Sequence, residues 1–198
     1  MAVRNLDGFF QPRAIVVVGP ERIGKAACEL FFANLARTGF RGKVTLAGVP
    51  APEGWSGGVV TSLATFDEKA DLAVVLSGGS TAVEVIERLG ALKIKAALFV
   101  SRGYDEWSFA TSRLALQTAR KHGLRLIGPG SLGVMSLHGD LDLSLAARPA
   151  KKGDLALVSR SAAVINSTLA WAEENGVGFS SVVSLGQKVD VDVGDLLD

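Results

Sequence analysis

The most informative stretch of this sequence is IVVVGPERIGKAAC, residues 15–28. The continuous β-branched run at residues 14–18 is typical of a strand buried on both faces of a parallel sheet. It leads into Gly19, and residues 24–37 carry an apolar stripe at helical spacing that ends at Gly39. A strand, a glycine turn and a helix in this order form the first unit of an α/β sheet, and the N–H groups at such a helix start can bind phosphate.

The same alternation continues along the chain. Further strands are predicted at residues 44–47, 72–76, 96–100 and 124–127, with helices at residues 81–92 and 107–122. This order predicts an α/β fold with a Rossmann-like, doubly wound parallel sheet and right-handed crossovers. After the polar segment RPAKKGD, residues 148–154, the pattern restarts with a strand at 155–159, a helix at 162–174, a strand at 179–184 and a helix from residue 193.

We therefore expect a Rossmann-like domain at residues 1–147, a linker at 148–154, and the truncated start of a second α/β domain at 155–198. A net charge of +1 over 198 residues gives no reason to expect a nucleic-acid or membrane partner. The single cysteine, Cys28, cannot form an internal disulfide, and the first 13 residues contain no apolar run of signal-peptide length. Both observations favour a cytoplasmic protein.

The glycine loop reads G-x-x-x-x-G-K-A, which is one hydroxyl short of the phosphate loop of ATPases. Ala26 cannot hold magnesium, and no predicted strand ends in the Asp that would supply a second ligand. NAD binding requires a carboxylate after the second strand, but residues 46–50 read LAGVP. The loop therefore suits a pyrophosphate or a 3′-phosphate bound without metal, with Arg22 and Lys25 adding positive charge. A purely structural turn at Gly19, with Lys25 solvated, remains an alternative.

Three other strand ends are rich in small residues: SGGS at 77–80, SRG at 101–103 and GPGS at 128–131. They follow predicted parallel strands, and ligands of open α/β sheets bind at that edge. Small residues there leave room for a ligand, although they also simply make short turns.

The sequence offers no candidate for a catalytic residue. His122 is the last residue of a predicted helix, where a capping or surface role is expected, and His138 lies in SLHGD near the linker. Ser161 lies at a strand-to-helix turn without a nucleophile-elbow motif, which predicts a helix cap. We predict no metal site, because the histidines and Cys28 have no ligand spacing. The carboxylates of the C-terminal segment also lack such spacing: Asp190, Asp192 and Asp195.

Three stretches carry a family resemblance: LDGFFQPRAIVVVG at 6–19, LIGPGSLGVM at 126–135, and residues 153–198. They resemble the N-terminal part of the NDP-forming acyl-CoA synthetases, relatives of the succinyl-CoA synthetase α subunit. The resemblance implies a Rossmann-like CoA-binding domain followed by a flavodoxin-like ligase domain, whose phosphohistidine would lie beyond residue 198. It also implies the ADP-forming acetate–CoA ligase type of reaction, which interconverts acyl-CoA, ADP and phosphate with acid, CoA and ATP.

The resemblance further implies that coenzyme A or acetyl-CoA lies across the strand ends. Its partners would be the remaining domains of the same protein or a separate ATP-grasp subunit, with a homo-oligomer possible, and this fragment alone would be inactive. The residues expected at the phosphates are Gly19, Pro20, Arg22, Ile23, Gly24 and Lys25. Those flanking the nucleotide are Pro50, Ser77, Gly78 and Gly79, and those near the pantetheine or thiol are Ser101, Gly128, Pro129 and Ser131.

Several family motifs are altered in this chain. The family's GPNSLG has Gly130 in place of Asn, and its SQSGA has become SRSAA at residues 159–163. The SAAV form of the second motif resembles bacterial protein lysine acetyltransferases, in which a synthetase-like region is fused to a GNAT domain. This gives the alternative that the chain is a regulatory, acetyl-CoA-sensing or structural region of such a protein.

Overall fold

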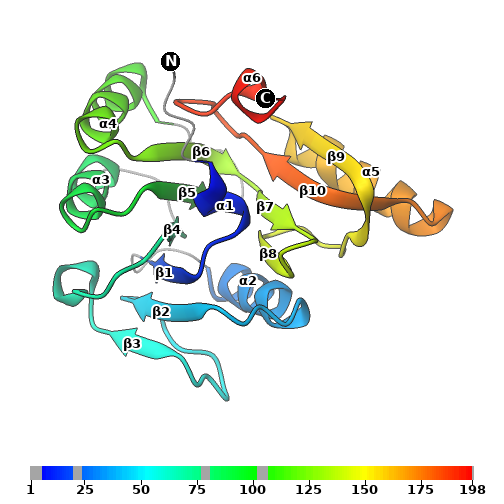
Figure 1. Cartoon of the computed structure of the whole chain (residues 1–198), viewed down its shortest axis with the longest axis horizontal. Coiled ribbons are helices and arrows are strands. Elements are labelled where there is room, and N and C mark those ends of the chain that lie inside the picture. Colours follow the sequence, from blue (N-terminus) through cyan, green and yellow to red (C-terminus); the bar gives the residue numbers. More distant parts are fainter. Residues whose placement is uncertain (1–5, 20–23, 77–80, 102–106, 198) are drawn as a thin grey trace.

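The computed structural model describes residues 6–19, 24–76, 81–101 and 107–197, which form two sheets with helices around them (Figure 1). The first sheet is parallel throughout, with the strand order β3-β2-β1-β4-β5-β6. This confirms the Rossmann-like α/β fold. Its strands are β1 (Ala14–Val18), β2 (Lys43–Ala47), β3 (Gly58–Val60), β4 (Leu72–Val75), β5 (Ala96–Val100) and β6 (Arg125–Ser131).

Helices cover both faces of the first sheet because its central strands are apolar on both sides. Val17 packs in one core cluster with α2 (Lys25–Arg37), and Val16 packs in another with α3 (Ala82–Ala91) and α4 (Phe109–His122). A short helix, α1 (Asp7–Phe10), and the 3-10 turn η1 (Leu63–Thr65) complete this part. The helices predicted at 24–37, 81–92 and 107–122 are confirmed to within two residues at each end.

Strand β6 differs from its prediction. The sequence predicted a strand at 124–127 followed by a turn, but the strand runs through GPGS to Ser131. Gly128 has a φ of +99°, and a Cβ there would lie 2.6 Å from the carbonyl oxygen of Phe99 on β5. The glycines therefore let β6 pass close to its neighbour instead of ending the strand.

The second sheet has the order β8-β7-β10-β9. Its strands are β7 (Gly133–Ser136), β8 (Leu141–Ser144), β9 (Lys151–Ser159) and β10 (Gly178–Ser184), and α5 (Ala162–Asn175) connects the parallel pair β9 and β10. The predicted strand at 155–159 begins four residues earlier than expected. The hairpin of β7 and β8 was not predicted, and β7 pairs antiparallel with β10. The expected helix after residue 193 is α6 (Val193–Leu197).

Polar contacts join α2 of the first sheet to β8 of the second. The amide of the buried Asn34 donates to the carbonyl oxygens of Ser144 and Ala146, at 2.9 and 3.0 Å. Arg37 lies 3.2 Å from the carboxylate of Asp142, which is 2% exposed. Burial raises the pKa of Asp142, although hydrogen bonds from Ser144 and the charge of Arg37 oppose the shift.

In the described part of the chain, every helix is too short or too polar to cross a membrane.

Candidate functional site

The loops after β1 and β2 meet at the carboxyl edge of the first sheet. The N–H of Gly19 donates to the carbonyl of Ala47, at 3.3 Å. A Cβ on Gly19 would lie 2.6 Å from Cγ2 of Val49, and a Cβ on Gly48 would lie 3.0 Å from the carbonyl oxygen of Gly19. The glycines therefore permit a close approach of the two loops, which is a structural reason for Gly19. Pro50 follows them and is exposed.

Helix α2 begins beside these loops. Gly24 is its N-cap, and a Cβ there would meet no atom of the described residues within 4 Å. The first residue, Lys25, has a side chain that is 91% exposed and lies 3.8 Å from Glu29. A 13-residue helix presents free N–H groups and a partial positive charge at this end. The other residues predicted nearby lie outside the described residues: Pro20, Arg22, Ile23, Ser77, Gly78 and Gly79.

The ends of β5 and β6 hold the remaining predicted residues. The N–H of Ser101 donates to the carbonyl of Ser131, at 3.1 Å. Ser131 is fully buried, and its hydroxyl donates to the carbonyl of Ser184 and accepts from the N–H of Gly133, at 2.5 and 2.9 Å. The hydroxyl of Ser131 therefore ties the first sheet to β10. Gly128 also lies inside the structure, because its backbone packs closely against the backbone of Phe99 on β5.

A cavity of about 560 Å³ lies between these strand ends and the start of α5. It brings together Ser101 and Pro129 from the predicted set, whereas Gly19, Gly24, Lys25 and Pro50 do not line it. The residues on its other side are Arg160, Ser161, Ala162, Ala163, Asn166, Gly186 and Gln187. Sequence reasoning treated this second strand-to-helix turn as a cap only. Its likeness to the first turn, with a strand, small residues and a helix start, was the signal that could have revealed the cavity.

The electrostatics of this cavity favour anionic or carbonyl oxygens. Ser161 caps α5 as predicted, because its Oγ accepts from the N–H of Val164, at 3.3 Å. Arg160 donates from Nε to the carbonyl of Gly186, at 3.3 Å, and adds a positive charge beside the helix start. The hydroxyl of Ser101 is buried without a hydrogen-bond partner among the described residues.

Four other polar side chains singled out in the sequence have structural partners. Asp190 and Asp195 bind Arg125, at 2.8 and 3.0 Å, and Asp192 accepts from the N–H groups at the start of α6. His122 lies 3.2 Å from Glu87. Across the described residues, no group of three or more His, Cys, Asp or Glu side chains is placed to hold a metal ion.

Two family models match this chain. The model described as a CoA binding domain matches residues 13–136, and the one described as a succinyl-CoA ligase like flavodoxin domain matches residues 152–198. The first match covers more than half of the chain and includes the strand ends from β1 to β6.

Three relatives with similar sequences are named as ADP-forming CoA ligases. The α subunit of ADP-forming acetate–CoA ligase I of Pyrococcus furiosus is 29% identical over 98% of this chain and 44% of its own length. The ADP-forming acetate–CoA ligase of Methanocaldococcus jannaschii is 28% identical, over 94% of this chain and 26% of the relative. The ADP-forming 4-hydroxybutyrate–CoA ligase of Nitrosopumilus maritimus is 29% identical, over 94% of this chain and 27% of the relative. The chain thus spans less than half the length of these relatives.

A solved structure agrees with these relatives. The dinucleotide forming acetyl-coenzyme A synthetase 1 of Ca. Korarchaeum cryptofilum, in complex with phosphate and ADP, has a TM-score of 0.86 and 27% identity. The likeness covers 99% of this chain and 42% of that one. These relatives give no support to the acetyltransferase alternative. The chain belongs to the CoA-binding domain family, and over nearly its whole length it is similar to ADP-forming acetate–CoA ligases and to this acetyl-coenzyme A synthetase.

Proposed function

We propose that this chain binds CoA or acetyl-CoA across the carboxyl edge of the first sheet, as the CoA-binding part of an ADP-forming acyl-CoA ligase. The observation that carries the proposal is the family match over residues 13–136, which includes the glycine-rich loop, the start of α2 and the ends of β5 and β6. The positive end of the α2 dipole and the exposed side chain of Lys25 suit the phosphates.

In this proposal the CoA molecule runs from the start of α2 to the cavity at α5. Gly19, Pro20, Arg22, Ile23, Gly24 and Lys25 hold the phosphates, and Pro50, Ser77, Gly78 and Gly79 flank the nucleotide. The thiol end enters the cavity lined by Ser101, Pro129 and Gly130. There, the hydroxyl of Ser101, which has no hydrogen-bond partner among the described residues, and the start of α5 stabilise the thioester carbonyl or a phosphate oxygen. Gly128 and Ser131 are buried in β6 and hold the cavity-lining residues Pro129 and Gly130 in position.

The parent enzyme interconverts acyl-CoA, ADP and phosphate with acid, CoA and ATP in the cytoplasm. The nucleotide chemistry is supplied by further domains or by a separate ATP-grasp subunit, and a homo-oligomer is compatible with the open edge at β9. We keep residues 1–147 as the CoA-binding domain, 148–154 as the linker, whose last four residues already belong to β9, and 155–198 as the start of the ligase domain. The two family matches, which end at residue 136 and begin at residue 152, support a division in this region.

Calorimetric titration tests the proposal. CoA and acetyl-CoA should bind saturably, whereas NAD and ATP, added as controls, should not. Lys25→Ala should weaken CoA binding about three- to tenfold, the effect of one exposed charge contact. The double variant Arg22→Ala/Lys25→Ala should weaken it further. Lys121→Ala removes an exposed charge at the far end of α4 and should leave the affinity unchanged.

Unchanged CoA affinity in the double variant would overturn the assignment of the phosphate loop. No CoA binding by the folded chain would favour the alternative in which Gly19 makes a structural turn and Lys25 is only solvated.

A further inference from the structure

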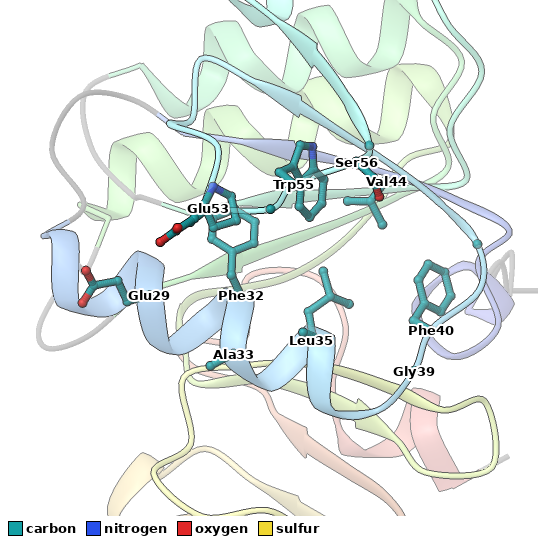
Figure 2. Close-up of a pocket in the computed structure, with 15 residues that line it drawn as sticks. Glu29, Phe32, Ala33, Leu35, Gly39, Phe40, Val44, Glu53, Trp55 and Ser56 are labelled. Atoms are coloured by element: carbon teal, nitrogen blue, oxygen red, sulfur yellow. The ribbon is translucent and has the colours of Figure 1, made fainter.

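A second cavity, of about 500 Å³, lies between α2 and the segment Pro52–Gly57 that follows β2 (Figure 2). Its inner surface is apolar, because Phe32 and Leu35 are buried and Val44 lies beside them. The ring of Trp55 lies 5.6 Å from that of Phe32, at an interplanar angle of 60°. Phe40 closes the far end. The size and the aromatic lining are those of a small-molecule site, and the described lining contains no residue predicted to bind CoA.

The charged side chains that line this groove are all negative. The two charged side chains of its described lining are both carboxylates, Glu29 on α2 and Glu53 on the loop, and they lie at the same end of the groove (Figure 2). Lys25 approaches Glu29 only to 3.8 Å, and both side chains are mostly solvated, at 91% and 65% exposure. This pair is therefore weak, and a cationic ligand can compete with Lys25 for Glu29.

We propose that this groove binds a small organic ammonium ion with an aromatic or aliphatic body. The body packs on Phe32 and Trp55, which supply apolar contact and a cation–π surface. The indole N–H of Trp55 donates to the carbonyl of Gly58, at 3.4 Å, so its polar edge is already engaged by the protein. The ammonium group lies between Glu29 and Glu53. The site is separate from the CoA site and does not rest on it.

A matched series of probes tests the charge requirement. The chain is titrated with 2-phenylethylamine, with the neutral 2-phenylethanol and with the anionic 3-phenylpropionate. Binding is followed by the indole N–H cross-peaks of the three tryptophans in a ¹H–¹⁵N spectrum, with the Trp55 peak assigned by Trp55→Phe. The amine should shift the Trp55 peak saturably and bind at least about fivefold more tightly than the alcohol. The peaks of Trp107 and Trp171 should not move, and the carboxylate should bind most weakly.

Charge variants separate this site from the CoA site. Glu29→Gln/Glu53→Gln should weaken amine binding about tenfold without weakening CoA binding, since loss of Glu29 only frees Lys25. Glu174→Gln, which removes an exposed carboxylate on α5, is the matched control and should alter neither. Lys25→Gln should have opposite effects on the two ligands. It frees Glu29 and so should tighten amine binding about twofold, while CoA binding weakens.

Three results would overturn this proposal. One is equal affinity for the amine, the alcohol and the carboxylate, which would mean an unselective apolar groove. Another is amine binding that survives loss of both carboxylates. The third is tight binding of the dipeptide Ac-Phe-Lys-NH₂ with no binding of the free amine, which would assign the groove to a basic segment of a partner protein. Failure of CoA binding alone would leave the amine result intact, so the two proposals fail independently.

Discussion

At the residue scale, two glycines two positions apart on β6 have different roles. Gly128 has a φ of +99°, and a Cβ there would meet the backbone of Phe99 at 2.6 Å. Gly130 has a φ of +69°, but a Cβ there would meet nothing within 4 Å. The first glycine is therefore required by packing, whereas the second is required only by its left-handed backbone, which Asn tolerates. Gly130 also lines the cavity beside α5.

Substitutions at the two positions should separate these roles. Gly128→Ala should lower the free energy of unfolding by at least about 2 kcal/mol, because backbone strain and a backbone clash add. Gly130→Asn should cost no more than about 1 kcal/mol. Urea denaturation followed by circular dichroism measures both. Equal losses in the two variants would contradict this account of β6.

At the element scale, the strands that form central, apolar parts of the first sheet were predictable. The predicted bounds of β1 and β5 match the structure, because every residue of β5 is buried and four of five in β1 are. Strand β9 lies at an edge and is largely exposed, so Lys151 and Lys152 gave no apolar signal for its start. Strand β8 is buried but contains Asp142, whose partner Arg37 lies 105 residues away in the sequence. Tertiary pairing of this kind leaves no local pattern.

The same limit applies to the candidate site. The carboxyl ends of β1 and β5 and the GPGS part of β6 were identifiable because each apolar run ends in small residues. The part played by Arg160 and the start of α5 depends on how the second sheet packs against the first, through contacts such as that of Ser131 with Ser184. That packing brings together residues from widely separated strands, and the sequence of either strand alone does not indicate it.

The contact between α2 and β8 should make stability depend on pH. Burial raises the pKa of Asp142 above its ordinary value of 3.8, so the folded protein holds the proton more tightly than the unfolded chain does. The stability from this group is fully present below that ordinary value and is lost as pH rises through the raised pKa. Asp142→Asn should remove this loss, so the variant should gain stability relative to the parent between about pH 4 and 7.

Urea unfolding at a series of pH values measures this difference. The lost ion pair with Arg37 should cost little, because the arginine side chain is 42% exposed. Glu84→Gln, at an exposed site on α3, is the control. A parent that gains stability over the Asp142 variant as pH rises from 4 to 7 would contradict the assigned direction of the shift.

At the scale of the whole molecule, one core cluster joins the two sheets. It contains Val17 and Leu98 from the first sheet together with Leu143, Val183 and Ile165 from the second sheet and α5. The cavity at α5 is therefore held between two parts that share one core. This arrangement fixes the carboxyl edge of the first sheet against the start of α5, which is the geometry on which the proposed CoA site depends.

The most direct test of the CoA site is the position of amide shifts in a ¹H–¹⁵N spectrum when CoA is added. The largest shifts should fall at the carboxyl edge of the first sheet, at Gly19, Gly24, Ser101 and Gly130. The turns at the opposite edge, at Gly39 and Gly139, should remain unchanged. Saturable shifts at the carboxyl edge would establish it as the CoA site. Shifts confined to the opposite edge, or no shifts at any CoA concentration up to its solubility limit, would contradict the account.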